Sequence, residues 1–367
     1  MRKADVIIVG GGAIGLMCAW MLARRGVRIL VIDSGGPAAT HAAAGMLSPS
    51  FERSLHGGGD ALGEFSRASL SLWREIAPAL EEASGVDIDY DESGVLCVAL
   101  DDLEASVFDA DSRYCDRLER NEVLELEPAL SSSVRCAWFA RTDAQVDPRR
   151  VREALKRAIA RESGAVKFDS RVVSIETHGA RAGRVRLASG ESLEAGRIVL
   201  ATGARIDGLA ELPAGAVFPV KGEALAVERI ASAPRRVVRT GGAYLCPKSD
   251  GRIIIGATEL NRDRSLNTDD RRLRELRAAA EIAFPGLEDA AETERWAGLR
   301  PATADGAPII GPAPLAPGLI YALGHYRNGV LLAPASAAAI ADLIASGRAG
   351  PEIAAFSAAR FTELGDS

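Results

Sequence analysis

Hydrophobic residues in the first part of the chain gather into runs that predict a strand, a helix and a second strand. Val6 to Val9 is a continuous apolar run, as expected of a strand buried on both faces of a parallel sheet. Val27 to Ile32 is a second such run, and the apolar stretch between them is long enough for a helix. The N-terminal segment is therefore expected to form a βαβ unit.

Three glycines lie between the first strand and the helix. Gly10, Gly12 and Gly15 have the G-x-G-x-x-G spacing of a dinucleotide-binding turn. The first two allow a tight turn and close approach of the backbone to a pyrophosphate, and the third lets the helix pack against the strand. Ala13 and Ile14 begin that helix, whose N-terminus would face the phosphates.

An acidic residue follows the second strand, at the separation from the glycines that suits a dinucleotide-binding unit. Asp33 can accept hydrogen bonds from a ribose diol, and Ser34 comes directly after it. A glycine triplet alone is weak evidence. The triplet together with strand, helix, second strand and terminal acid predicts dinucleotide binding.

Later patterns predict one well-marked helix and further strands. Asp147 suits a helix N-cap and Pro148 the first helical position. One apolar face of that helix would consist of Val151, Leu155, Ala158 and Ile159. Short strands are expected at Val86 to Asp91, Gly94 to Leu100, Val166 to Phe168, Arg171 to Glu176, Arg184 to Leu187 and Arg197 to Leu200. From about Val217 through Ile255, strands alternate with turns, which suggests the sheet of a second domain.

Composition narrows the class of protein. The 367 residues, 47% of them hydrophobic, can bury a large core and are expected to form two domains. The formal net charge of −6 argues against general affinity for nucleic acid.

The N-terminus and the cysteines bear on location. Met1 to Leu22 superficially resembles a secretory signal, but glycines dominate its centre, and the run is short for a transmembrane helix. The five cysteines are scattered without a C-x-x-C pair, so neither a disulfide framework nor a metal site is expected. These features predict a cytoplasmic protein without a transmembrane segment.

Four further motifs occur in order along the chain: Ala42 to Leu47, Pro219 to Glu223, Trp296 to Pro301 and Gly324 to Gly329. With the glycine turn, they resemble the D-amino-acid oxidase family of FAD enzymes, and within it the glycine oxidases of thiamine biosynthesis. The resemblance extends to about residue 345. It implies FAD as the cofactor and an α/β fold, in which a Rossmann-like FAD-binding domain joins an α+β substrate domain built on a large antiparallel sheet.

The resemblance also implies how the chain is divided and what it does. Residues 1–85, 146–212 and 296–367 would form the FAD-binding domain, and residues 86–145 and 213–295 the substrate-binding domain. The expected reaction is oxidative deamination of glycine, sarcosine or a small D-amino acid, by hydride transfer from the substrate Cα to flavin N5. The imine would hydrolyse to the 2-oxo acid, and molecular oxygen would be reduced to hydrogen peroxide.

Two other functions stay open. A dehydrogenase of the same family would pass its electrons to a quinone or a protein. A flavin module in a tRNA-modifying assembly would need a phosphate-binding surface, against which the acidic balance argues. A homo-oligomer is also compatible with the sequence.

Three residues are expected to handle the substrate. Arg300 matches the family's carboxylate-binding arginine, whose planar fork would donate two parallel hydrogen bonds; a structural arginine capping a loop is the alternative. Tyr244 matches the tyrosine that lines the substrate pocket, or else it is a core strand residue. The resemblance places Arg327 at the flavin and substrate, and the alternative is a surface residue at a helix start.

Residues around these motifs are expected to contact FAD. Ala44, Gly45 and Met46 occupy the family's flavin-contact loop, where small residues permit close approach to the isoalloxazine. Thr40 would reach the pyrophosphate, and the backbone of Val172 the adenine. The last motif and its continuation add His325, Tyr326, Arg327, Asn328, Gly329, Val330 and Leu331.

Three details qualify the resemblance. Val330 to Ile344 reads as a buried helix, with Pro334 in its first turn or kinking it, whose N-terminus would stabilise reduced flavin. His41 is displaced by one position from the pattern of relatives with a covalently attached flavin, so noncovalent FAD is preferred. Ala302 stands where glycine is usual, and this departure leaves the substrate less defined than the reaction type.

Overall fold

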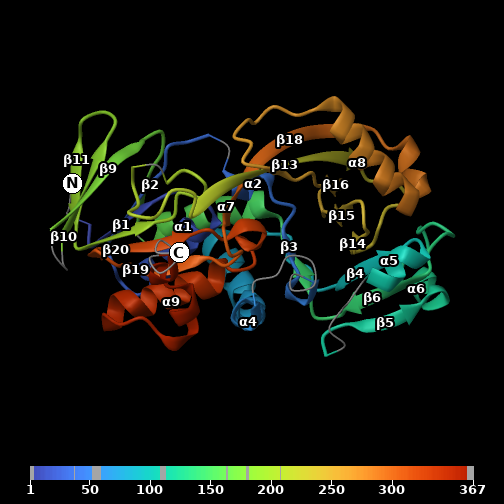
Figure 1. Cartoon of the computed structure of the whole chain (residues 1–367), viewed down its shortest axis with the longest axis horizontal. Helices are drawn as coiled ribbons and strands as arrows, with labels where there is room; N and C mark the ends of the chain where they lie inside the picture. The colour runs from blue at the N-terminus through green and yellow to red at the C-terminus, as the bar shows by residue number, and fades with distance from the viewer. Residues whose placement is uncertain are drawn as a thin grey trace.

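The chain forms two lobes, each built on its own sheet, which lie side by side along the long axis (Figure 1). The structure, a computed structural model, describes residues 4–361 except 37, 52–58, 108–112, 163, 179–181 and 207.

A six-stranded sheet forms the centre of the first lobe, in the order β19-β20-β12-β1-β2-β8. Its strands are β1 (Val6–Val9), β2 (Ile29–Ile32), β8 (Ala165–Lys167), β12 (Arg197–Leu200), β19 (Ile309–Ala313) and β20 (Ala316–Leu323). Neighbouring strands are parallel except β19 and β20, which are antiparallel. The predicted βαβ unit lies at the centre of this sheet.

Two layers cover the six-stranded sheet. On one face pack α1 (Ala13–Arg24), α4 (Gly59–Ser84), α7 (Pro148–Arg161) and α9 (Ala333–Ser346), which share a core with Ile8. On the other face lies a three-stranded sheet of β9 (Val172–His178), β10 (Ala182–Leu187) and β11 (Ser192–Ala195), which shares a core with Ile7. Successive residues of β1 therefore serve two cores, which explains its continuous apolar run.

Local signals in the sequence account for the starts of α1 and α7. Gly10 has φ +115°, and a Cβ there would lie 2.2 Å from the Ala201 carbonyl oxygen. A Cβ on Gly15 would lie 2.0 Å from the Gly10 carbonyl oxygen, so strand and helix can approach only through glycine. The Asp147 side chain accepts hydrogen bonds from two backbone N–H groups in the first turn of α7, as predicted, with Pro148 at the start of the helix.

A nine-stranded sheet forms the second lobe, in the order β17-β13-β16-β15-β14-β4-β6-β5 with β18 paired to β13. Its strands are β4 (Val95–Ala99), β5 (Asp116–Glu119), β6 (Cys136–Ala140), β13 (Val217–Glu228), β14 (Val237–Arg239), β15 (Tyr244–Pro247), β16 (Arg252–Gly256), β17 (Leu260–Asn261) and β18 (Glu292–Thr303). Only the β4–β14 pair is parallel among the described ladders of this sheet. The helices of this lobe are α5 (Asp102–Val107), α6 (Arg120–Leu126) and α8 (Asp270–Ala283).

Short elements complete the description. Near the contact between the lobes lie α2 (Ala39–Ala42), β3 (Met46–Leu47) and β7 (Ala144–Gln145). Short 3₁₀ helices occur at η1 (Pro285–Asp289), η2 (Tyr326–Asn328), η3 (Pro351–Phe356) and η4 (Ala358–Phe361).

The structure differs from the sequence expectations at three places. Val86 to Asp91 is not a strand, apart from one bridge at Asp91, because Asp89 has φ +59° and its N–H bonds the Asp87 carboxylate in a local turn. Residues 296–303 belong to β18, so the chain rejoins the six-stranded sheet only at β19, later than the expected boundary at residue 296. Helix α9 begins at Ala333 rather than Val330, with Pro334 in its first turn.

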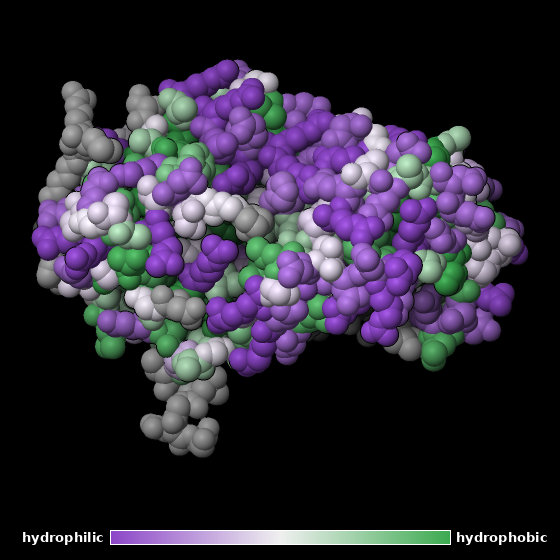
Figure 2. Space-filling view, turned by 90° about the horizontal axis from the view of Figure 1, so that it is seen from above, coloured by the Kyte–Doolittle hydropathy of each residue, from purple (hydrophilic) through white to green (hydrophobic). Residues whose placement is uncertain are grey.

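The remaining structural expectations concern cysteines, metals and the surface. All five cysteines are buried, and none of them forms a disulfide bond. Within the described ranges, no group of three His, Cys, Asp or Glu side chains could hold a metal ion, and no helix is long and apolar enough to cross a membrane. The face in Figure 2 is mostly hydrophilic, with hydrophobic side chains scattered over it.

Candidate functional site

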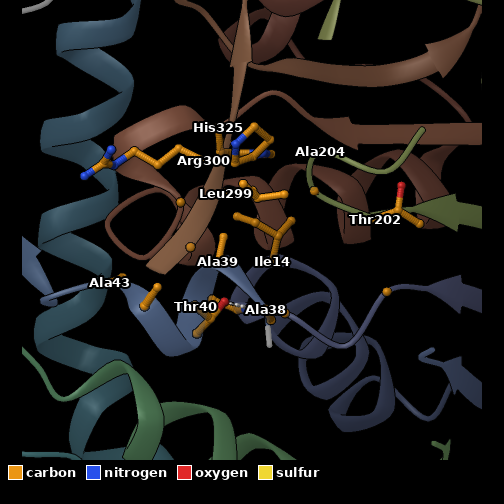
Figure 3. Close-up of a pocket in the computed structure, with 18 of the residues that line it drawn as sticks. Ile14, Ala38, Ala39, Thr40, Ala43, Thr202, Ala204, Leu299, Arg300 and His325 are labelled. Carbon is orange, nitrogen blue, oxygen red and sulfur yellow. Dashed lines mark hydrogen bonds between the residues drawn. The ribbon is translucent and has the colours of Figure 1, made fainter. Parts of the chain in front are cut away.

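A pocket of about 670 Å³ lies where the two lobes meet, a volume typical of small-molecule and cofactor sites. Its walls come from the glycine turn, from α2 and the loop after it, from β15 and β18, and from the segment before α9. In Figure 3, Arg300, Leu299 and His325 lie across the pocket from Thr40 and Ala43.

The end of the pocket at β1 and β2 has the chemistry of a nucleotide site. Asp33 follows β2, and its two carboxylate oxygens accept hydrogen bonds from Gly11 N (2.6 Å) and Gly35 N (2.9 Å). Thr40 Oγ1 accepts a hydrogen bond from Ala13 N (2.9 Å) and so lies at the N-terminus of α1. Free N–H groups at such a terminus favour phosphate oxygens.

One buried polar atom supports the fit of a nucleotide. The Oγ1 atom of Thr202, which lines the pocket beside the glycine turn, is buried and has no hydrogen-bond partner among the described residues. A buried hydroxyl without a partner costs free energy, so its position in a cofactor-sized pocket suggests that the partner is a ligand. The glycine turn, Asp33 and Thr202 therefore fit an FAD nucleotide.

The loop from Ala44 to Met46 lines the middle of the pocket. Gly45 O accepts a hydrogen bond from Val146 N (2.9 Å), which ties the loop to the segment before α7. Trp296 Nε1 donates to Ala42 O (3.0 Å), which ties α2 to β18. His41 is exposed and its side chain is not among the groups that line the pocket, in keeping with the preference for noncovalent FAD.

Arg300 projects from β18 into the part of the pocket formed by the second lobe. Its Nη1 donates to Thr258 O (3.1 Å), and within the described ranges no carboxylate oxygen lies within 4.0 Å of the guanidinium. Burial and the nearby Arg327 charge lower the pKa of Arg300 from its usual value, while the group stays charged at any ordinary pH. A partly buried guanidinium in this situation suits an anionic ligand.

Tyr244 lines the same part of the pocket from the start of β15, opposite Gly256 of β16. Its ring lies over Gly256, where a Cβ would come within 2.2 Å of the Tyr244 hydroxyl oxygen. Burial raises the pKa of Tyr244, so its hydroxyl remains a hydrogen-bond donor at neutral pH.

Arg327 has a defined partner on the rim of the pocket. The carboxylate of Glu259 accepts a hydrogen bond from the Tyr326 hydroxyl with one oxygen and pairs with Arg327 Nη2 through the other. Sequence reasoning identified no partner for Arg327, because the two residues are 68 positions apart.

In the segment after β20, His325, Val330 and Leu331 are buried, and α4 holds the end of the segment. His325 Nε2 and Ser336 Oγ are 3.0 Å apart, and burial lowers the pKa of His325 to about 3, so its ring is neutral. Ser69 Oγ donates to Leu331 O (2.6 Å), and Trp73 Nε1 to Val330 O (3.1 Å). These bonds from α4 satisfy carbonyls just before α9.

The pocket lining includes every predicted site residue except Gly15 and Leu331. Thr202, Gly222 and Arg239 line the pocket too and were not predicted as site residues. Arg239 is opposite Tyr244 in the β14–β15 ladder, a nonlocal pairing without a sequence signal. Thr202 lies in the segment of small residues that follows β12.

Comparison with known proteins decides the family. The sequence profile of a family described as FAD dependent oxidoreductase matches residues 5–343. The chain belongs to this family. The match covers both lobes and the whole pocket, which confirms the predicted cofactor, FAD.

Several members of the FAD dependent oxidoreductase family resemble the chain over most of its length. A glycine oxidase of Bacillus licheniformis is 36% identical over 364 aligned residues, which cover 94% of each protein. A bifunctional protein ThiO/ThiG of Synechocystis is 35% identical over 98% of this chain, which spans about half (54%) of that protein. The crystal structure of glycine oxidase from Geobacillus kaustophilus matches with a TM-score of 0.89 at 31% identity, covering 97% of this chain and 98% of that one. These relatives confirm the predicted fold and the predicted class of enzyme, an FAD-dependent amino acid oxidase.

Proposed function

We propose that this protein oxidises glycine, sarcosine or a small D-amino acid to the corresponding imine and passes the electrons to molecular oxygen. The observation that carries the proposal is the Arg300 guanidinium, which faces the pocket, donates to a backbone carbonyl and has no carboxylate partner in the described part of the chain. A substrate carboxylate supplies that partner. The names of the glycine oxidase relatives support the same substrate class.

The residues around the pocket divide the work. The glycine turn, Asp33, Thr40 and Thr202 would hold the nucleotide of FAD, and the loop from Ala44 to Met46 would contact its flavin. Val172 would contact the adenine, and the segment from His325 to Leu331 would support the flavin. When bound, FAD supplies the acceptor for the hydride that leaves the substrate Cα.

Arg300 and Tyr244 hold the substrate. The Arg300 fork binds the carboxylate, and the Tyr244 hydroxyl donates a further hydrogen bond to it, so the Cα hydrogen has a fixed direction. The substrate amine reacts as the neutral base, whose lone pair forms the C=N bond as the hydride leaves. No catalytic base is required, and the neutral His325 is a packing group rather than a proton acceptor. Water then hydrolyses the imine to the 2-oxo acid and the free amine.

Turnover in air tests the proposal. With glycine, the purified holoenzyme is expected to release hydrogen peroxide, ammonia and glyoxylate in equal amounts. Sarcosine should give methylamine in place of ammonia. The proposed substrate class would be wrong if the holoenzyme oxidised none of glycine, sarcosine and D-alanine, either in air or with an artificial acceptor.

The electron acceptor is tested separately. A dehydrogenase would show fast reduction by substrate, slow reoxidation in air and fast reoxidation by a soluble quinone analogue. We expect oxygen to be the faster acceptor. A cytoplasmic location, a role in thiamine biosynthesis and assembly into a homo-oligomer stay predictions.

A further inference from the structure

Segment 257–269, between β16 and α8, forms the rim of the pocket on the second lobe. Ala257, Arg264 and Leu266 of this segment line the pocket. Its short strand β17 pairs with β13 at Val220 and Lys221. The segment therefore borders the pocket and is attached to the sheet that carries Arg300.

Interactions along the segment fix its position. Thr258 O accepts a hydrogen bond from Arg300 Nη1 (3.1 Å). The buried Lys221 Nζ contacts Ser265 Oγ (2.9 Å), Asp263 Oδ2 (3.4 Å) and the buried Glu223 Oε1 (2.9 Å). Lys221 thus holds the far part of the segment.

Glu259 is the acidic group of this segment that meets the pocket lining. Its carboxylate binds the Tyr326 hydroxyl and the Arg327 guanidinium, and both of these residues line the pocket beside Arg300. Burial acts to raise the pKa of Glu259, but the Tyr326 hydrogen bond and the Arg327 charge outweigh it and lower the pKa below its usual value. Glu259 is therefore an anion at neutral pH.

Arg300 and Arg327, two of the six arginines that line the pocket, would by themselves attract a ligand with two carboxylates. Arg300 and Arg327 are close enough for the charge of one to lower the pKa of the other. Glu259 compensates the charge of Arg327 and places a negative charge on the rim. A second carboxylate on a substrate would meet this charge, whereas the first would still reach Arg300.

We propose that Glu259 is a specificity-determining residue, which restricts the pocket to amino acids with a single carboxylate and excludes those with an acidic substituent on Cβ or nitrogen. This inference rests on the proposed function and defines the charge of its substrate. Discrimination arises here from a repulsive group directed against the wrong ligand.

Matched substrate pairs test the proposal. D-Alanine and D-aspartate differ by a carboxylate on Cβ, and sarcosine and iminodiacetate by a carboxylate on the N-substituent. The ratio of kcat/KM within each pair is measured for the wild-type holoenzyme and for Glu259→Gln, which removes the charge and keeps an acceptor for the Tyr326 hydroxyl. We expect the acidic member to gain about fivefold to tenfold relative to its neutral partner, because interactions of a half-exposed charge are worth roughly 1 kcal/mol.

The control variant is Asp263→Asn, which removes one carboxylate from the same segment by the same kind of change. Asp263 pairs with Lys221 rather than with Tyr326 or Arg327, so its neutralisation should leave both ratios within about twofold, the scatter of near-neutral surface changes. Added salt should weaken the preference of the wild type and not that of Glu259→Gln. Equal shifts in both variants, or no shift in Glu259→Gln, would overturn the proposal.

Ligand binding separates this proposal from the proposed function. The dissociation constants of acetate and malonate are measured from thermal shifts of the holoenzyme, without turnover. Glu259→Gln should strengthen the binding of malonate relative to that of acetate, even if no member of either amino acid pair is oxidised. If Glu259→Gln does not yield holoenzyme, Glu259→Met removes the same charge at similar length. An unchanged malonate-to-acetate ratio contradicts the role of Glu259, whereas absent turnover with a changed ratio contradicts only the substrate class.

Discussion

A Cβ on Gly222 would lie 2.4 Å from both Nη1 and Nη2 of Arg300. Gly222 is on β13, the strand directly next to β18. The two strands are paired along eleven residue positions, which include Val220 opposite Arg300. The glycine therefore leaves the space through which the arginine reaches the pocket.

Gly222→Ala should move the guanidinium without altering its charge. Because a charge-assisted hydrogen bond contributes about 1.5–3 kcal/mol, we expect KM for glycine to rise by about tenfold or more. Steady-state kinetics and the ratio of flavin to protein check this outcome. Gly63→Ala in α4 is the matched control, since its added methyl meets nothing closer than 3.4 Å. A KM unchanged by Gly222→Ala would show that the position of Arg300 does not govern substrate binding.

Arg300→Lys keeps the charge and loses the bidentate fork. Apparent affinity for glycine, sarcosine and D-alanine should fall by about tenfold or more, while FAD content stays near normal because the glycine turn is elsewhere. Tyr244→Phe should be milder, because the ring still packs over Gly256. A structural arginine would give another pattern, in which stability and flavin retention fall together and the kinetic constants of the remaining holoenzyme do not change. Arg327 would then be the next candidate for the carboxylate anchor.

Local signals in the sequence predicted the elements around the nucleotide end of the pocket. The glycine turn, the acid after β2 and the Asp147 cap each act over a few residues, and the structure has each at the expected end of its strand or helix. The pairing of strands is nonlocal, so the sequence did not indicate that residues 296–303 belong to the second sheet.

The partner of Arg327 could not be found for the same reason. Glu259 reaches it only because segment 257–269 runs along the rim of the pocket, an arrangement set by β17 and by Lys221. The Thr202 hydroxyl has no partner within the described residues, and this too is a property of the folded site.

Noncovalent FAD is expected from the exposed position of His41. Acid precipitation of the yellow holoenzyme should leave all flavin in the supernatant and none on the protein. His41→Ala should purify with the same flavin content and absorbance spectrum. Flavin that remains with the precipitate of the wild type, but not of His41→Ala, would instead indicate a covalent bond to this histidine.

Thr202→Val should weaken FAD binding without lowering the stability of the apoprotein. The hydroxyl has no partner within the described residues, so its removal leaves no protein group unsatisfied. Loss of one neutral hydrogen bond to the cofactor corresponds to about 1 kcal/mol, or roughly fivefold in the dissociation constant of FAD. Flavin titration of the apoprotein measures this change, with Thr202→Ser as the control that keeps the hydroxyl. A stronger effect on apoprotein stability than on FAD affinity would mean that Thr202 serves packing.

His325 and Asp143 should make opposite contributions to the pH dependence of stability. Burial lowers the pKa of His325 to about 3 from 6.5, so its neutral form is favoured in the folded state. The contribution of His325 to the free energy of unfolding is complete above pH 6.5, falls as the pH decreases and is gone below about pH 3. The loss between pH 6.5 and pH 5 amounts to about 2 kcal/mol. His325→Gln, which can still bond Ser336, should therefore show a shallower loss of stability over this range.

Asp143 should change the pH dependence of stability in the direction opposite to that of His325. It is buried, its two carboxylate oxygens bind the hydroxyls of Ser48 (2.6 Å) and Ser50 (2.7 Å), and burial raises its pKa to about 7. The contribution of Asp143 to the free energy of unfolding is complete below about pH 4 and is lost as the pH rises through 7, because the buried carboxyl group must then ionise. Asp143→Asn should accordingly lose stability more steeply in acid than the wild type and gain stability relative to it at pH 8. Both predictions are tested by the denaturant midpoints of the wild type and the two variants, measured at saturating FAD from pH 5 to pH 8. If both variants shift the curve in the same direction, neither buried group controls the pH dependence.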